Sequence, residues 1–566
     1  MADKSLFVFT IGPVQSFISQ ARKARDLYAG SFLLSYLMGR VIEVLSNYDQ
    51  KHIEIVFPAV INGEYNIPNR VVAVVLDYNN FQKRALGNVL EEQTRNLFRQ
   101  IGDEILKKLG LTISEAYKEQ IQQQLEMYWL FQDYEDYQTG YREMVNKLNE
   151  IKRLRRFQQI TEAAGRKCTL NPDKNIIFYS KPLHFVNRQK AILFRHPAYP
   201  YALEEREGLS AVAFIKRMLF VHQDIQKTTY QKDFPSVLEI PLRSRLKEES
   251  EKKLLQQLGP DSGSVVFDLY NGLRPQQAAK QINTEKEKAA AAIIQYIKSR
   301  EKALKKPFLS SYYALVKFDG DDMGTLYREA RIHKDTDYKE FQKRLSEELC
   351  QFAAYVKRGI TEEEGAVIYA GGEDFLGLLA LDTLFDVLIR LRRKFAQIDM
   401  KEYLDKTLSF SAGIAVAHIK TPLKQVIAKA DEMEHFAKEI DADKDAFALA
   451  VMKRSGEEVK TRLKFGQDIS GLDEIHKLVK VFQTAQISNS FGYGFNSFLT
   501  EFAEVDTGLK DAMVKCELER QLMRSETEGD PSVYAKDIFR FYKHYDSIHS
   551  FMDALNVVMF LAREVV

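Results

Sequence analysis

The sequence predicts an α+β protein built from two similar modules, each followed by a mainly helical block. Short apolar runs rich in β-branched and aromatic residues, which are typical of strands, occur in two separate groups. Long charged stretches with helical periodicity follow each group. The chain has 566 residues, more than a single hydrophobic core supports, so several domains are expected.

The first module is predicted to run strand, helix, strand, strand. A helix is expected at about residues 14–45, and a mainly polar helical stretch at about 80–159. The predicted strands are SLFVFTIG (5–12), IEIVFPAV (53–60) and RVVAVVLDY (70–78). The middle of the chain is less regular and ends in an Ala-rich charged helix that Pro307 stops.

The second module repeats this order. Two apolar runs joined by a Gly-rich turn, GAVIYAGG and DFLGLLAL, predict a hairpin at residues 365–381. Further strands are predicted at YYALVKFD (312–319), LSFSAGIAVAH (408–418) and FALAVMKRSG (447–456), with helices between them and from about 465 to the end. The predicted domains are 1–160, 161–306, 307–464 and 465–566.

Composition narrows the class of protein. Hydrophobic residues make up 45% and charged residues 28%, an ordinary globular balance, and the net charge of +2 does not by itself indicate a nucleic-acid binder. The three scattered cysteines argue against a disulfide framework. We find no apolar stretch approaching the roughly 20 residues of a membrane span and no signal peptide, so a cytoplasmic protein without membrane contact is expected.

Acidic residues gather where two predicted strands end. Asp319 follows one strand, and Glu373 and Asp374 follow Gly371 and Gly372 in the hairpin turn. If these strands pair, the three carboxylates converge, and such a cluster is costly unless a cation neutralises it. Mg²⁺ or Mn²⁺ would bring phosphate oxygens, and the two glycines would let a triphosphate approach the backbone. This arrangement predicts in-line attack of a hydroxyl on an α-phosphate.

Each of these residues also has a simpler interpretation. Asp and Gly are common in exposed turns, so either acidic motif alone would carry little weight. Lys438 and Lys444 are candidate triphosphate contacts, or else ordinary exposed lysines near a helix C-terminus. His418 could act as a base, but a hydrogen-bonded histidine at a strand end is the favoured interpretation.

Several segments together resemble the large polymerase/cyclase-like subunit of type III CRISPR effector complexes of the Cmr kind (III-B). They are IGPVQSFISQARKARDLYAGSFLLSYL, EREGLSAVAFIKR, FPSVLEIP, KFDGDDMG, IYAGGEDFLGLL, SFSAGIAVAHIKTPL and ALAVMKRSGE, in family order over roughly the first 460 residues. The resemblance implies two ferredoxin-like palm domains related to nucleotidyl cyclases, ATP bound between them, and other Cmr-type subunits as partners. It implies activation when guide RNA pairs with target RNA, and a cyclic oligoadenylate product.

The same resemblance assigns roles to particular residues. Asp319, Glu373 and Asp374 would hold the metals, and Gly371 and Gly372 would form the turn beneath the phosphates. The first palm would supply the acceptor pocket, with Gln15, Ser16 and Ser31 as its candidate residues, although packing duty explains these three equally well.

The chain departs from the family pattern in three ways. The palm motif begins within the first dozen residues, so we expect no His-Asp nuclease domain. Cys168 has Asn171 where a C-x-x-C partner would sit, so we expect no Cys₄ zinc site. The turn reads GGED in place of GGDD, and Glu lengthens one carboxylate arm by a methylene.

These departures leave three interpretations open. Family members without the nuclease domain include some that transfer AMP onto S-adenosylmethionine, so the acceptor is either that compound or another adenine nucleotide. A scaffold subunit with a decayed site is the second interpretation. The third is a GGDEF-type diguanylate cyclase, which we rank last because it leaves IGPVQSF and KRSGE without a place.

Overall fold

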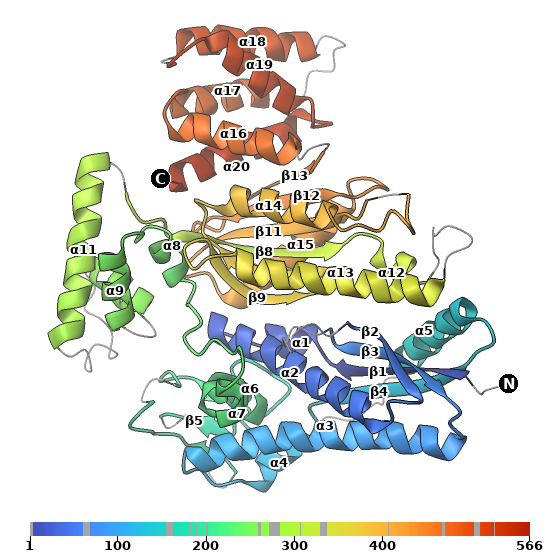
Figure 1. Ribbon diagram of the computed structural model, residues 1–566. Coiled ribbons are helices and arrows are strands. Elements are labelled where there is room, and N and C mark those ends of the chain that lie inside the picture. The colour runs from blue at the N-terminus through green and yellow to red at the C-terminus, as the bar shows by residue number, and fades with distance from the viewer. Residues whose placement is uncertain are drawn as a thin grey trace.

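The computed structural model describes residues 4–565 apart from a set of short segments. These are 60–67, 154–161, 163, 182, 185, 187–189, 200–201, 259–261, 271–283, 306, 329–336, 406, 467–469, 503–509 and 526. Figure 1 shows two sheets one above the other, with the helices of the C-terminal region stacked beyond the second sheet and a smaller group of helices, α8 to α11, at one side.

The first sheet has four antiparallel strands in the order β2-β3-β1-β4. They are β1 (Lys4–Gly12), β2 (Ile53–Phe57), β3 (Arg70–Leu76) and β4 (Glu126–Asp133). The alternating side chains of β1 face opposite cores, with Leu6 and Val8 on one side and Phe7 and Phe9 on the other. Numbered along the module, the order is 4-1-3-2, which is the ferredoxin-like arrangement the family resemblance implied.

The polar helical stretch predicted at about 80–159 is mainly helical, but the prediction missed a strand within it. The structure has α3 (Asn80–Lys108), α4 (Glu115–Gln122), strand β4 and α5 (Tyr137–Arg153) in that range, and 154–159 lie outside the described residues. The aromatic run MYWLF within β4 pairs along β1, and this tertiary pairing outweighs the polar sequence on either side.

The single helix expected at 14–45 is divided into α1 (Gln15–Ser19) and α2 (Ala24–Tyr48). The break has a physical cause, because the buried Lys216 ammonium donates to the carbonyl oxygens of Phe17 (2.6 Å) and Gln20 (2.7 Å) at the end of α1. These carbonyls therefore find their partner in another segment of the chain rather than in a continuing helix.

Helix α2 also corrects the expectation that no segment is apolar and long enough to span a membrane. By length and composition it would pass that test, but 72% of its most apolar window is buried inside the protein. The helix packs against α3, α6 and the second sheet, so its apolar character is that of a core helix.

The middle region contains short elements around a three-stranded sheet of order β6-β5-β7. Its strands are β5 (Phe178–Tyr179), β6 (Ile192–Leu193) and β7 (Gly208–Leu209). The described helices are α6 (Ala211–Met218), α7 (Gln223–Gln226), α8 (Glu239–Arg243), α9 (Glu249–Leu258), α10 (Ser262–Tyr270) and α11 (Thr284–Leu304), with a 3₁₀ turn at Leu219–Val221.

The second sheet has six strands in the order β13-β12-β11-β8-β10-β9. They are β8 (Tyr312–Gly320), β9 (Gly365–Gly371), β10 (Asp374–Leu379), β11 (Phe410–His418), β12 (Ala446–Met452) and β13 (Glu458–Lys464). The helices are α12 (Met323–Leu326), α13 (Tyr338–Gly359), α14 (Leu384–Ala396) and α15 (Leu423–Lys438). Four of the strands repeat the 4-1-3-2 order, and the hairpin prediction is confirmed. Strand β13 was not predicted, because its alternating charged residues lack the apolar run of a strand.

The remaining helices are α16 (Ser470–Gln483), α17 (Asn489–Phe502), α18 (Lys510–Arg524), α19 (Pro531–Tyr542) and α20 (Ile548–Glu564), as the sequence predicted. The two ferredoxin-like modules contact each other directly. Tyr137 donates to the Gln342 side chain (2.7 Å), and the Ala59 amide donates to the Ser346 hydroxyl (2.7 Å). The α+β fold class is therefore confirmed.

Candidate active site

The predicted carboxylates meet at one end of the second sheet. Phe318 on β8 is in register with Phe375 on β10, which places Asp319 opposite Asp374 as the strands run on. The Asp319 and Asp374 side chains are joined by a hydrogen bond. A Cβ atom added at Gly320 would lie 2.8 Å from the Glu373 Cβ atom, so the third carboxylate also packs closely on the end of β8.

The two glycines form the turn that brings Glu373 and Asp374 to this edge. Gly372 has φ of +69° and has open space around its missing side chain. Gly371 lies under the Tyr369 ring, where a Cβ atom would come within 2.1 Å of the hydroxyl oxygen. Glycine is therefore needed at 372 for backbone conformation and at 371 for space.

The pKa values of Asp319 and Asp374 are shifted in opposite directions. Burial raises the pKa of Asp374 well above its usual value, and the hydrogen bond with Asp319 and the charge of Glu373 raise it further. Burial also acts to raise the pKa of Asp319, but the hydrogen bond from Asp374 and the charge of Lys438 outweigh it and lower the pKa. The Asp374 side chain is exposed at the start of β10, and the pKa values of the two carboxyls move in opposite directions, as expected for two like charges held together.

All three acidic residues lie close enough to Tyr369 to shift the pKa of its hydroxyl. Burial raises the pKa of the Tyr369 hydroxyl well above its usual value, and the charges of Asp374, Glu373 and Asp319 raise it further. Glu373 itself has a raised pKa, first from burial and then from the Asp319 charge. The edge of the sheet is therefore strongly negative, which favours a cation.

Arg70 is a functional candidate that sequence reasoning missed. It begins strand β3 of the first module, yet its charge acts on Glu373 of the second and opposes the rise in the pKa of that carboxyl. It stacks over the Phe57 ring, 5.8 Å from the ring centre, and Phe57 in turn contacts Tyr327. No local pattern marks Arg70, because its position depends on how the two modules pack.

Lys438, a candidate triphosphate contact, lies at the carboxylates. The Lys438 ammonium, at the end of α15, donates to the Asp319 carboxylate and to Glu434 (2.7 Å). Lys317 donates to Asp431 (2.6 Å) and forms an ion pair with Glu434 (3.0 Å). Lys317 was missed, although it precedes Asp319 by two residues on the same face of β8, a spacing that the strand period makes visible.

The other two aspartates of the DGDD segment, Asp321 and Asp322, have structural contacts of different kinds. Asp321 is buried and accepts hydrogen bonds from the hydroxyls of Ser409 and Ser411 (both 2.8 Å) and from the Asp445 amide (3.1 Å). It therefore ties the end of β8 to neighbouring loops. Asp322 is exposed and pairs with Lys444 (2.6 Å). The structure thus places Lys444 beside Asp322 rather than at Asp319.

The donor set fits a divalent cation bound together with a nucleotide. Within the part of the chain that the structure describes, no three His, Cys, Asp or Glu side chains form a ready-made metal cage. Mg²⁺ commonly binds through only one or two protein carboxylates and completes its shell with phosphate oxygens and water. Asp319 and Asp374, which lie opposite each other where β8 and β10 pair, form such a pair.

The first-module candidates lie in two different environments. Gln15 and Ser16 are exposed in the first turn of α1, whereas Ser31 is only 2% exposed inside α2. The structure gives no contact between any of the three described side chains and the carboxylates. His418 pairs in register with Tyr312, at the far end of β11 and β8 from Asp319, and its Nδ1 accepts the Lys420 amide (3.1 Å). It is a structural histidine, as favoured.

The cysteine region forms a tight turn without a zinc-binding set. The Cys168 amide donates to the Lys174 carbonyl (2.8 Å), and the Leu170 amide donates to the Cys168 sulfur (3.4 Å). The side-chain Oδ1 atom of Asn171 accepts a hydrogen bond from the Asp173 amide (2.9 Å). Cys168, Cys350 and Cys516 are all free cysteines.

Comparison with known proteins identifies both modules. Residues 312–448 match the family model described as Cas10/Cmr2, second palm domain, and residues 6–126 match CRISPR-associated protein Cmr2, N-terminal. The chain is 25% identical to the CRISPR system Cmr subunit Cmr2 of Pyrococcus furiosus, over 92% of this chain and 69% of the relative.

Solved structures show the same fold. A type III-B Cmr-beta complex in the apo state contains a chain with a TM-score of 0.68 and 14% identity, covering 99% of this chain and 82% of that one. The Cmr-beta complex bound to cognate target RNA gives a TM-score of 0.62 and 15% identity, covering 99% and 83%.

Proposed function

The chain belongs to the Cas10/Cmr2 family, and on that premise we propose that it is the nucleotidyltransferase subunit of a type III-B CRISPR effector complex. It joins AMP from ATP to a second adenosine compound and so makes a signalling nucleotide. The observation that carries the proposal is the pairing of Asp319 with Asp374, with Glu373 packed beside them, at an open sheet end.

Asp319, Asp374 and Glu373 would hold Mg²⁺ or Mn²⁺. When bound, the cation would neutralise the carboxylates and would polarise the α-phosphate toward attack by the acceptor hydroxyl. Asp319 and Asp374 would hold it from the ends of the paired strands β8 and β10. Gly372 leaves open space at the turn for phosphate oxygens, while Gly371 makes room for the Tyr369 ring beneath it.

The cationic side chains orient the triphosphate. Lys438 balances the charge of Asp319 and would move to a phosphate oxygen when nucleotide binds, a short change for a flexible ammonium. Arg70 approaches from the first palm, so closure of the two palms on ATP adds a guanidinium to the phosphates. Lys444, held by Asp322, is placed for the outer phosphates.

The first palm supplies the pocket for the acceptor. Gln15 and Ser16 are exposed and can contact a second adenosine compound, whereas the buried Ser31 contributes packing of α2. The acceptor is either another adenine nucleotide, which leads to oligoadenylate, or S-adenosylmethionine, which leads to an AMP conjugate.

A similar structure is a Cmr-beta complex bound to cognate target RNA. As the family resemblance implies, pairing of guide RNA with target RNA in the complex would switch this site on, with other Cmr-type subunits as partners in the cytoplasm.

Mass spectrometry of the reaction products tests the proposal. The reconstituted complex is incubated with target RNA, Mg²⁺ and isotopically labelled ATP, with and without S-adenosylmethionine. A new adenylate product that depends on Mg²⁺, and that Asp319→Ala abolishes while the complex still assembles, is the expected result. Equal output from the natural complex and the variant would instead indicate a scaffold subunit, and a product made only from GTP without RNA would indicate a diguanylate cyclase.

A further inference from the structure

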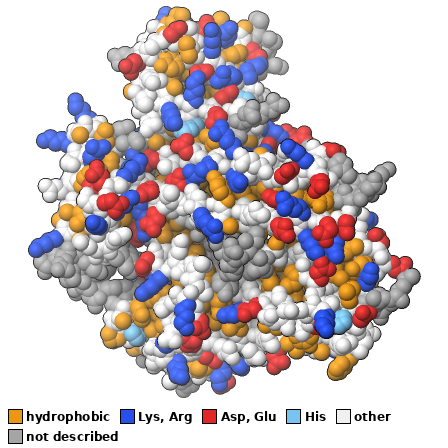
Figure 2. Space-filling model, in the orientation of Figure 1, with side chains coloured by type: hydrophobic (Ala, Val, Ile, Leu, Met, Phe, Trp, Pro, Cys, Tyr) orange, Lys and Arg blue, Asp and Glu red, His pale blue; other side chains and the backbone are white. Residues whose placement is uncertain are grey.

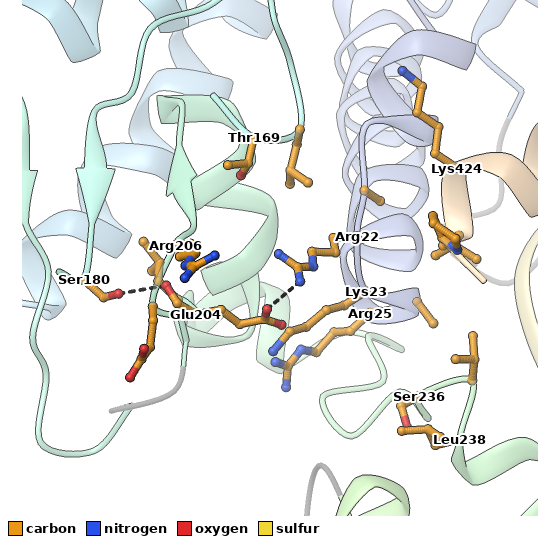
Figure 3. Close-up of a pocket in the computed structure, with 18 of the residues that line it drawn as sticks. Arg22, Lys23, Arg25, Thr169, Ser180, Glu204, Arg206, Ser236, Leu238 and Lys424 are labelled. Carbon is orange, nitrogen blue, oxygen red and sulfur yellow. Dashed lines mark hydrogen bonds and ion pairs between the residues drawn. The ribbon is translucent and has the colours of Figure 1, made fainter. Parts of the chain in front are cut away.

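A large cavity lies away from the carboxylates, between the first palm, the middle region and the second palm. Its volume is about 2120 Å³. Segments distant in the sequence line it, among them residues 21–25 at the start of α2, the turn at 168–172, the loops at 194–197 and 203–206, the stretch at 234–239 and the connection from β11 to α15 at 419–424. Figure 3 shows Arg22 and Lys23, which precede α2, and Arg25 in its first turn, all projecting toward the loop that carries Glu204 and Arg206.

This groove is separate from the active site. It opens beside residues 419–424, which follow His418 at one end of β11, whereas Phe410 at the other end pairs with Gly320 beside Asp319. A nine-residue strand separates the two ends, which corresponds to roughly 25 Å at the usual rise per residue. An occupant of the groove is therefore not the nucleotide that reacts at Asp319 and Asp374.

Positive charge is concentrated in the groove. Eight lining residues are Lys or Arg and four are Asp or Glu: Arg22, Lys23, Arg25, Lys181, Arg195, Arg206, Lys420 and Lys424 against Glu204, Glu205, Glu239 and Asp268. Arg22 forms an ion pair with Glu204 (2.7 Å), and Lys181 forms one with Glu205. Glu239 forms an ion pair with Arg243 (3.0 Å), which is not among the lining residues.

Six of these cations form no ion pair among the described residues: Lys23, Arg25, Arg195, Arg206, Lys420 and Lys424. Two of them still act on nearby carboxyls, Lys23 on Asp26 and Lys420 on Asp268. The Arg25 Nε atom is buried with no hydrogen-bond acceptor, and its guanidinium lies 5.6 Å from the centre of the Phe220 ring. On the face that Figure 2 shows, by contrast, Lys and Arg side chains are interspersed with Asp and Glu. A concave wall with excess cations focuses potential and attracts a polyanion.

The lining also selects the kind of polyanion. Single small ligands usually occupy roughly 300–1,000 Å³, so a groove of 2120 Å³ suits an extended chain. Hydroxyls line it beside the cations, at Ser19, Thr169, Ser180, Ser236 and Thr421. His196, stacked on Tyr199 with 5.0 Å between ring centres, offers a flat surface at the rim. Cations along a groove with hydroxyls and flat rings are the recognition chemistry of single-stranded nucleic acid.

We propose that this groove binds a segment of single-stranded RNA through its phosphodiester backbone. The arginine forks and lysines contact phosphate oxygens, and the hydroxyls contact phosphates or the ribose 2′-OH. The proposal does not depend on nucleotidyl transfer, because the groove and the carboxylates lie at opposite ends of the second sheet. Binding and catalysis can therefore fail independently.

Fluorescence anisotropy with the full chain and a labelled single-stranded oligoribonucleotide of about 12 nucleotides tests the proposal. The groove variant is Arg195→Glu, Arg206→Glu and Lys424→Glu combined, since all three side chains are exposed and unpaired among the described residues. We expect its affinity to fall by about 100-fold or more, and the slope of log affinity against log salt to fall by about 2 to 3.

A matched control carries the same change of charge elsewhere. Lys515→Glu, Arg524→Glu and Lys536→Glu alter three exposed cations of the C-terminal helices and should leave the affinity within about 3-fold. Equal weakening by both triple variants would overturn the proposal, because it would reduce binding to net charge. Displacement of the RNA by poly-glutamate at equal charge concentration would also overturn it, since the groove would then be a site for acidic protein segments. Unchanged melting temperatures establish that both variants are folded.

Discussion

The two palms share a strand order but differ in what stands at the end of the central strand. Strands β1 and β8 each have nine residues and each end in glycine, Gly12 and Gly320. One residue before the glycine, the first palm has Ile11 where the second has Asp319. Across the sheet, the Ile11 amide donates to the Asn69 carbonyl (3.0 Å), whereas Asp319 is hydrogen-bonded to Asp374.

The comparison separates fold from chemistry. The same backbone register presents an apolar side chain and an amide in one palm, and two carboxylates in the other. The ferredoxin-like arrangement therefore supplies a place where two strand ends meet, and the residues at that place decide whether a cation and a nucleotide can bind.

The strongest test of this comparison replaces the equivalent residues in turn. Asp374→Ala should reduce product formation by about 1,000-fold or below detection, because it removes one of the two carboxylates available to a cation. Asn69→Ala, at the matching register position of the first palm, should keep the rate within about 5-fold. Both rates are measured by mass spectrometry with the assembled complex, and comparable losses in the two variants would refute the asymmetry.

The palms also differ in their buried charges. Arg217 is fully buried and pairs with Asp26 (2.6 Å) and Glu207 (2.9 Å) beneath the first palm. The second palm has Arg392 against Asp445 (2.7 Å), a pair that keeps partial contact with solvent. Removing one member of a fully buried pair leaves an uncompensated charge, so the first network should matter more to stability.

Arg217→Met should therefore lower the free energy of unfolding by about 3–5 kcal/mol. Arg392→Met should lower it by about 1–2 kcal/mol, since solvent can reach the unpaired Asp445. The first urea transition, followed by circular dichroism, measures both values. If the two variants were equally stable, the first palm would not rely on its buried ion network more than the second does.

Sequence reasoning located the second palm better than the first. Strand β8, the β9–β10 hairpin and the meeting of Asp319 with Asp374 were predicted, because apolar runs and a Gly-Gly turn mark them locally. Strand β4 was missed because its partner lies more than 100 residues away along the chain. No local pattern carries information of that kind.

The same limit applies to the site. Lys438 was predicted as a candidate triphosphate contact, but its contact with Asp319, the pairing of Lys444 with Asp322 and the approach of Arg70 to Glu373 all depend on tertiary packing. The break between α1 and α2 depends on Lys216, which lies about 200 positions further along the chain. Residue type at a strand end is readable from sequence, whereas the partners that surround it are not.

The glycines that end β1 and β8 give a smaller contrast. A Cβ atom at Gly320 would meet Met323 Cγ at 2.7 Å and Glu373 Cβ at 2.8 Å, whereas one at Gly12 would meet only the Glu126 carbonyl, at 3.8 Å. Gly320→Ala should displace Glu373, cost about 1–3 kcal/mol of stability and lower product formation about 10-fold. Gly12→Ala should change both by little. Thermal melting and the product assay together decide, and a silent Gly320→Ala would show that Glu373 need not be held against β8.

The smallest expected effects distinguish two surface ion pairs, one in each palm. Lys83 pairs with Asp133 at the end of β4 (2.5 Å), and Lys444 pairs with Asp322 after β8 (2.6 Å). Both pairs reach solvent, so Lys83→Met and Lys444→Met should each change stability by about 1 kcal/mol or less. Only Lys444→Met should also raise the KM for ATP, by about 3-fold, because Lys444 lies beside the carboxylate edge and Lys83 does not. An unchanged KM in both variants would assign Lys444 to the loop that follows α15 and remove it from the nucleotide site, leaving Lys438 and Arg70 as the cations that meet the phosphates.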